Sequence, residues 1–183
     1  MNKNLPSSEL VIRPASFNDI KYIQQIADAT WQQTYTPILS KDQIDYMLGK
    51  FYSTPSLADQ MKNNHHFLLA LLNYTPVGFA SFSHVGEKAF KLEKLYVLPY
   101  VQKTGAGKKL LETVETVAKS MGAETLILNV NRKNKAKTFY EKNGFRVIRE
   151  EDIDIGNGYF MNDYIMSLTL SPSPGTGEGG HAL

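Results

Sequence analysis

The spacing of the apolar residues changes along this chain, and the change restricts the folds that it can adopt. Near the start, Ile20, Ile23 and Ile26 recur at helical spacing. The run HFLLALL at 66–72 is instead continuously apolar, and VGFASFSH alternates as its hairpin partner after the turn NYTP. A chain that passes between these two patterns favours helices packed on a sheet.

Before that sheet signal, the short strand LVIRPAS is followed by three predicted helices. The stretches SFND and SKDQ carry the capping-box pattern that starts a helix. We expect the first helix to end near Tyr35, the second to end at Gly49 and a third to begin at Ser56.

The remaining sequence alternates between strand and helix signals. AFKLEKLYVLP is a strand, an amphipathic helix follows and ends at Gly122, and TLILNV is a buried strand. NKAKTFYEKNG is a short helix, and two last strands surround the turn GNG. The order predicts an α/β (α+β) domain with a central mixed seven-stranded sheet flanked by helices. We place the domain at residues 9–170 and expect the Pro/Gly/Ser-rich tail 171–183 to be disordered.

Composition excludes several classes of function. Lys plus Arg (20) nearly balance Asp plus Glu (18), so no nucleic-acid partner is indicated. The 183 residues include no cysteine, which rules out disulfides and cysteine-ligated metals, and His65 and His66 are adjacent rather than at metal-binding spacing. The longest apolar run is too short to span a bilayer, and MNKNLPSSEL lacks the apolar core of a signal peptide. We therefore expect a cytoplasmic protein without a metal or a membrane partner.

The stretch QKTGAGKK contains the clearest candidate ligand site. A Walker A loop would need Gly at Gln102 and Ser or Thr at Lys109, and a dinucleotide fingerprint would need a third glycine at Leu110. The stretch matches a third pattern, [QR]-x-x-G-x-[GA], in which glycines and a helix N-terminus suit a pyrophosphate. Taken alone, these residues fit a glycine-containing turn before a helix equally well.

The surrounding motifs extend the match. The strand KLEKLYV, the loop QKTGAG, a helix and the strand TLILNV are followed by Asn134, Ala136, Phe139, Tyr140, Gly144 and Phe145. In content and order they resemble the GNAT superfamily of acyl-CoA-dependent N-acyltransferases, over about residues 10–170 and most sharply over 92–145. The resemblance implies the GNAT fold, in which a bulge splays the fourth strand from the fifth and acyl-CoA lies between them. Acetyl-CoA is then the cosubstrate.

The resemblance also implies roles for particular residues. Tyr140 matches the tyrosine that donates a proton to the departing CoA thiolate, a feasible transfer because thiol and phenol pKa values lie near about 8.5 and 10. Glu93 matches a general base acting through water, although a solvated glutamate between two lysines is an equal alternative. The residues expected to bind the cofactor are Leu95, Tyr96, Val97, Gln102, Lys103, Thr104, Gly105, Ala106, Gly107, Lys108, Asn134, Lys137 and Tyr140.

Two further stretches concern the acceptor. TWQQTYTPILSKDQIDYML and DIDIGNGYFMNDYIM resemble the PaiA branch of bacterial polyamine N-acetyltransferases, which implies spermidine or spermine as substrate. Residues 150–163 hold five acids and no base, and Asp152 and Asp154 share a strand face that would attract a polycation. Trp31 and Tyr35, one helical turn apart, could wall the amine site. A solvated acidic hairpin and core aromatics are the alternatives.

Other functions stay open at this point. The acceptor could be a protein or peptide amine or an antibiotic amine, and the chain could be a non-catalytic acyl-CoA-binding sensor. Relatives in the family are often dimers, so a homodimer is also compatible with the resemblance.

Overall fold

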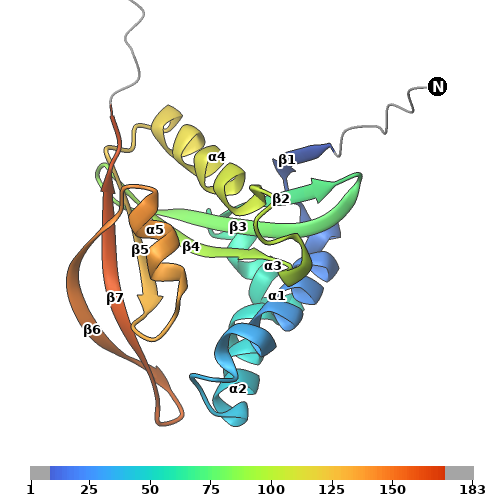
Figure 1. The fold of residues 1–183 in the computed structure, drawn as a ribbon, viewed down its shortest axis with the longest axis vertical. Helices are drawn as coiled ribbons and strands as arrows, with labels where there is room; N and C mark the ends of the chain where they lie inside the picture. The colour runs from blue at the N-terminus through green and yellow to red at the C-terminus, as the bar shows by residue number, and fades with distance from the viewer. Residues whose placement is uncertain (1–8, 172–183) are drawn as a thin grey trace, which may run out of the picture.

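The computed structural model describes residues 9–171, and within them seven strands form one mixed sheet in the order β1-β2-β3-β4-β5-β7-β6 (Figure 1). The predicted seven-stranded α/β architecture is therefore confirmed. The expected disordered tail lies, from residue 172 on, outside the described residues. The strands are β1 (Leu10–Pro14), β2 (His66–Leu72), β3 (Thr75–Gly86), β4 (Ala89–Val97), β5 (Thr125–Asn131), β6 (Arg146–Gly156) and β7 (Tyr159–Thr169).

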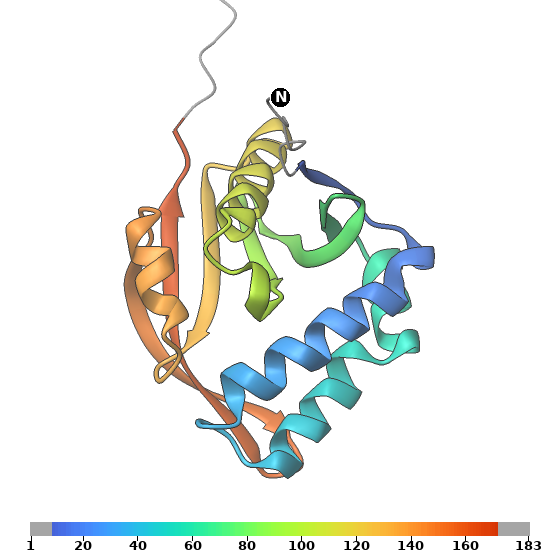
Figure 2. The ribbon, with the colours of Figure 1, turned by 45° about the vertical axis from the view of Figure 1, so that its right-hand side comes forward.

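Helices cover both faces of the sheet. They are α1 (Ile20–Tyr35), α2 (Lys41–Tyr52), α3 (Thr54–Lys62), α4 (Ala106–Ser120) and α5 (Ala136–Lys142), with single 3-10 turns at Phe17–Asp19 and Pro99–Val101. Helices α4 and α5 share one core with the sheet, and α1–α3 share the other. We call these two sides the α4 face and the α1 face (Figure 2). Within residues 9–171, no helix is long and apolar enough to cross a membrane.

The sequence located the first three helices but misjudged two of their ends. Ser40 caps α2 as expected, accepting from the Gln43 amide at 3.2 Å. Gly49 was expected to end this helix, yet α2 continues to Tyr52, because an exposed glycine costs a helix only about 1 kcal/mol. Helix α3 begins at Thr54 rather than at Ser56, because the Ser53 side chain supplies the cap.

The corner between β1 and α1 is held by a fully partnered acid. Asp19 is 5% exposed and accepts from the Arg13 guanidinium at 2.9 and 2.8 Å and from the Ser16 amide at 2.9 Å. The hydrogen bonds from Arg13 lower the pKa of Asp19 from 3.8 to about 2, against the opposing effect of burial. Asp19 of the capping box predicted from SFND thus also forms an ion pair with the partly exposed Arg13.

A bulge in β4 separates the two halves of the sheet. Lys94 pairs with Ser81 of β3 and Leu92 pairs with Phe82. Glu93 between them therefore has no opposite residue in the β3–β4 register. Parallel pairing of β4 with β5 stops at Leu92, although β4 continues to Val97. The two strands therefore diverge, as Figure 2 shows, and the predicted splay is confirmed.

On the far side of the splay, the tip of the β6–β7 hairpin contacts α2. Tyr46 of α2 donates to the Ile155 carbonyl at 2.9 Å, and Lys50 donates to the same oxygen. Gly156 has φ of +89°, and a Cβ there would lie 2.7 Å from the Tyr46 hydroxyl oxygen. The positive φ therefore favours glycine, and any other residue would also displace the Tyr46 side chain from the hairpin tip.

Candidate functional site

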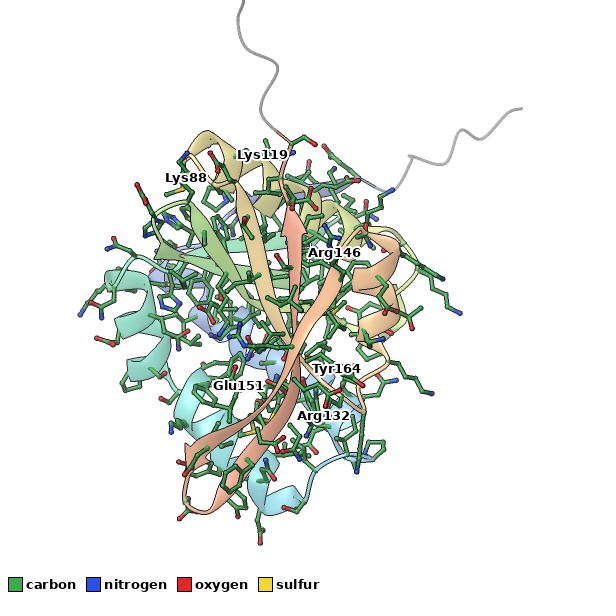
Figure 3. The ribbon with its side chains drawn as sticks, turned by 90° about the vertical axis from the view of Figure 1, so that its left-hand side faces the viewer. Lys88, Lys119, Arg132, Arg146, Glu151 and Tyr164 are labelled. Carbon is green, nitrogen blue, oxygen red and sulfur yellow. The ribbon has the colours of Figure 1, made fainter. Side chains whose placement is uncertain are left out.

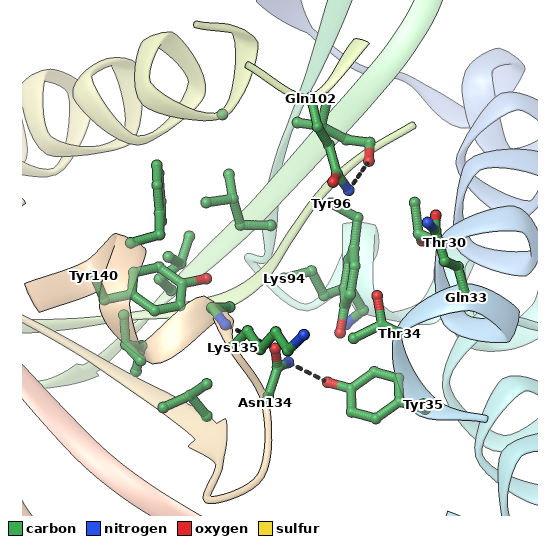
Figure 4. A pocket seen from close by; sticks show the side chains of 18 of the residues that line it. Thr30, Gln33, Thr34, Tyr35, Lys94, Tyr96, Gln102, Asn134, Lys135 and Tyr140 are labelled. Atoms are coloured by element: carbon green, nitrogen blue, oxygen red, sulfur yellow. Dashed lines mark hydrogen bonds between the residues drawn. The ribbon is translucent and has the colours of Figure 1, made fainter. Parts of the chain in front are cut away.

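A cleft of about 750 Å³ opens where β4 and β5 diverge. The C-terminal part of α1 forms one wall, and the start of α4, the β5–α5 loop and α5 form the other (Figure 4). Of the residues expected from the sequence, those that line it are Tyr35, Glu93, Leu95, Tyr96, Val97, Gln102, Lys103, Gly105, Gly107, Lys108, Asn134 and Tyr140.

The glycine loop ends in a helix N-terminus at this cleft. Gly105 is the N-cap of α4 with φ of +86°, a conformation that favours glycine, and no side chain caps the helix. The amides of the first turn therefore have no intrahelical acceptor and carry the positive end of the helix dipole. Lys103 and Lys108 line the same part of the cleft. This end can hold phosphate groups.

The β4 edge offers backbone rather than side chains. From Glu93 to Val97 it has no strand partner on the β5 side, while the side chains of Leu95 and Val97 pack in the α4-face core. Gln102 donates its side-chain amide to the Val97 carbonyl at 3.3 Å. An unpaired strand edge beside a phosphate-binding helix fits an extended ligand that adds as another strand, such as the pantetheine arm of acyl-CoA.

Tyr140 points its hydroxyl into the cleft from α5 (Figure 4). Its ring is 8% exposed and packs against Phe139 and Phe145, with centroids 5.3 and 5.7 Å away. Burial raises the pKa of Tyr140, so the phenol holds its proton at neutral pH. The residue can donate that proton to an anion formed beside it.

Glu93, the bulge residue, also lines the cleft but has partners of its own. It accepts from the Ser83 hydroxyl at 2.9 Å and lies 3.4 Å from the Lys91 ammonium. A direct role in proton abstraction would require these contacts to loosen.

The two aromatics expected around the amine occupy different positions. Tyr35 lines the cleft, and its hydroxyl lies 3.5 Å from the Asn134 amide nitrogen across the opening (Figure 4). Trp31 lies behind Tyr35, 4% exposed in the α1-face core, with ring centroids 4.5 Å apart. Only Tyr35 is therefore placed to contact a ligand.

Three residues expected at the cofactor lie away from the cleft lining. Lys137 pairs with Glu141 at 2.7 Å on the surface of α5, whereas Lys133 and Lys135 line the cleft. The Thr104 hydroxyl donates to the Val101 carbonyl at 2.6 Å, and Ala106 is buried in the first turn of α4. The lysines of the β5–α5 loop were missed because a loop's direction is set by tertiary packing.

Asp152 and Asp154 share a strand face, as predicted, but it is the α4 face. Their β6 neighbours Ile153 and Ile155 pack in the α1-face core, so the alternating aspartates point the other way. Asp152 pairs with Arg132 and is exposed, and Asp154 accepts from the Gly156 amide at 2.8 Å. Neither lines the cleft.

Asp163 of β7 was counted among the five acids of residues 150–163 but was not predicted to bind the substrate. It is 5% exposed, and its Oδ2 lies 3.4 Å from the amide nitrogen of Asn129, a cleft-lining residue. Its Oδ1 is buried without a hydrogen-bond partner. A signal existed, because Asp163 interrupts the alternating residues Tyr159, Met161 and Ile165, which predict a buried strand face.

No metal centre is evident in residues 9–171, where no three His, Asp or Glu side chains gather as ligands. The geometry is that of a cleft with a helix N-terminus at one end, an unpaired strand edge along it and a buried tyrosine that lines it.

Comparison with known proteins agrees with this geometry. The profile of the acetyltransferase (GNAT) domain matches residues 35–167. A spermidine N(1)-acetyltransferase of Thermoplasma acidophilum is 31% identical over 156 residues, which cover 82% of this chain and 94% of the relative. The alanine N-acetyltransferase of ribosomal protein bS18 from Haemophilus influenzae is 35% identical over 104 residues, 55% of this chain and 67% of that one.

The fold also matches a solved structure. The PaiA N-acetyltransferase of Thermoplasma acidophilum, crystallised in complex with coenzyme A, superposes with a TM-score of 0.76 and 29% sequence identity. The match covers 88% of this chain and 99% of that one.

Proposed function

This chain belongs to the GNAT family of acetyltransferases, and from that membership we propose that it transfers the acetyl group of acetyl-CoA to a primary amine of a polyamine such as spermidine. The observation that carries the proposal is the splay of β4 from β5, with the Tyr140 hydroxyl inside the resulting cleft. The splay places a strand edge that can bind acetyl-CoA next to a hydroxyl that can protonate the departing thiolate.

Acetyl-CoA would lie along the cleft. The pyrophosphate would bind the first turn of α4 around Gly105 and Gly107, where free amides and Lys108 favour a negative charge. The pantetheine would pair with the unpaired edge of β4, and a backbone amide there would polarise the thioester carbonyl. The 750 Å³ volume is typical of a site for a small ligand.

The transfer would be direct. The neutral amine attacks the thioester carbon, a C–N bond forms, the C–S bond breaks, and the amine loses one proton. Tyr140 donates a proton to the departing thiolate, which its position in the cleft supports. Glu93 stays a candidate to receive the amine proton through water, although Ser83 and Lys91 already contact it.

The relatives favour a polyamine but leave a second acceptor. The Thermoplasma spermidine acetyltransferase spans most of this chain. The alanine N-acetyltransferase of ribosomal protein bS18 matches about half of this chain, and a peptide amine is therefore the second candidate.

The test is a mass-spectrometric screen of purified protein with acetyl-CoA and separate amines. The panel contains spermidine, spermine, a peptide with N-terminal alanine and an aminoglycoside. We expect an acetylated polyamine. An acetylated peptide without acetylated polyamine would overturn the polyamine proposal, and coenzyme A binding without any product would favour a sensor.

A further inference from the structure

We infer that Asp163 binds an ammonium group of the acceptor other than the one that is acetylated, and so selects amines that carry more than one positive charge. The inference rests on the proposed polyamine function and adds to it a specific residue. It gives a role to the Asp163 carboxylate, which takes no part in the proposed binding of acetyl-CoA or in the proposed acetyl transfer.

The first observation is that Asp163 is buried without a full set of partners. It is 5% exposed, its Oδ1 accepts no hydrogen bond, and its Oδ2 has only the 3.4 Å contact with Asn129. An unsatisfied buried carboxylate costs free energy, and natural proteins rarely retain one without a ligand or a function.

The second observation is that neighbouring cations already have other partners. Lys91 pairs with Glu93 at 3.4 Å, and Arg149 pairs with Glu151 at 3.3 Å. Arg132 pairs with two further acids on the opposite face, Glu150 and Asp152. Among the described acids of this hairpin, Asp154 and Asp163 form no ion pair, and Asp163 is the buried one of the two.

The third observation is the face on which Asp163 stands. It pairs with Asn131 of β5 and with Glu151 of β6, and residues paired in this way share a face. Figure 3 shows Glu151 on the side of α1–α3, while Arg132 and Tyr164 lie on the side of α5. Asp163 therefore points to the α1 face, opposite the helix that carries Tyr140.

The fourth observation is its separation from the reaction centre. Adjacent strands lie about 4.8 Å apart, and β7 is the strand next to β5, which borders the splay. Asn129 bridges the cleft and Asp163, since it lines the former and contacts the latter. Asp163 itself lies behind Asn129 rather than in the cleft lining, so an ammonium would reach it past Asn129, at the end of an acceptor that extends from β5 towards β7.

The test compares amines of one and two charges. Wild type, Asp163→Asn and the control Glu150→Gln are assayed with spermidine, an α,ω-diamine and a monoamine of equal length. Glu150 stands on the same hairpin but is exposed on the other face. We expect Asp163→Asn to raise KM for spermidine and the diamine about 10- to 100-fold, as for a lost hydrogen bond to a charged group. The monoamine KM, the acetyl-CoA affinity and all Glu150→Gln constants should stay within about twofold of wild type.

Calorimetric binding of spermidine to the coenzyme A complex gives a readout independent of turnover, and the melting temperature shows that Asp163→Asn folds. A wild type that prefers the diamine, with the preference intact in Asp163→Asn, overturns the inference and leaves the proposed function standing. A wild type with no preference for polyamines over monoamines also overturns the inference, and a wild type that acetylates no polyamine overturns the proposed function as well.

Discussion

Two aspartates of this protein are equally buried, yet their surroundings are opposite. Asp19, at the corner between β1 and α1, and Asp163, beside the cleft, are each 5% exposed. Asp19 accepts hydrogen bonds from Arg13 and Ser16, and its pKa is lowered to about 2. Asp163 has one long contact, and burial raises its pKa.

The difference separates a group that stabilises the fold from one that the fold tolerates. A buried charge with good partners costs little, whereas one without partners lowers stability and is kept only for another reason. The corner is complete in the free protein. At the cleft, by contrast, Asp163 lies behind the lining residue Asn129 without a full set of partners, and we propose that a ligand supplies the missing group.

The largest effect is expected at the cleft. Tyr140→Phe should lower kcat about 100-fold, because a general acid typically contributes at least that factor. The acetyl-CoA affinity should change little, since the ring and its packing remain. Steady-state kinetics with calorimetric binding of acetyl-CoA measure both quantities, and an unchanged kcat would remove Tyr140 from the mechanism.

At the corner the loss should appear in stability instead. Asp19→Asn should lower the free energy of unfolding by about 2 kcal/mol, the value that corresponds to the lowered pKa. The kcat of the folded enzyme should not change, because the corner lies away from the cleft. Urea unfolding of wild type and Asp19→Asn measures the change in stability. A loss of kcat as large as that of Tyr140→Phe would contradict the assignment of Asp19 to stability alone.

Asp163→Asn should move stability the other way. Replacing an unpartnered buried carboxylate by a neutral amide of the same shape should raise the free energy of unfolding by up to about 1 kcal/mol. The same urea experiment tests this. A loss as large as that of Asp19→Asn would show that Asp163 stabilises the fold and would remove the contrast.

The smallest effect is a difference in pH dependence. The pKa of folded Asp19 lies below its unfolded value, so its stabilisation is present above about pH 4 and is lost as the pH falls towards 2. Asp163 has a raised pKa when folded, so its charged form destabilises the protein, and protonation removes that cost.

On acidification both asparagine variants should therefore approach wild type, Asp19→Asn from lower stability and Asp163→Asn from higher. Unfolding midpoints between pH 7 and pH 3 measure the two differences. Curves that approach wild type from the same side would contradict the assigned pKa shifts.

Most of the fold could be predicted because local patterns encode it. The strands around the splay and the capped helices follow from periods of two and 3.6 residues. The bulge is also encoded, since the apolar positions Phe90 and Leu92 shift register to Leu95 and Val97. The resemblance to a family supplied the meaning of the glycine loop, which local patterns alone leave open.

The acceptor side could not be read in the same way. Alternation shows that Asp152 and Asp154 share a face of the sheet. It does not show whether that face is the α1 face or the α4 face. That depends on the docking of the hairpin tip on α2, between residues more than 100 positions apart. Lys133 and Lys135 were missed for the same reason.

The order of the strands has a consequence for biosynthesis. β7 is made after every other strand of this sheet, yet it lies between β5 and β6 rather than at an edge. A nascent chain that ends before Tyr159 therefore leaves β5 and β6 without their shared partner, as exposed edges open to aggregation. It also lacks Asp163, so the sheet and the proposed acceptor site are completed by the same strand. A shortened product of this gene would be a target for chaperones and proteases rather than a smaller enzyme.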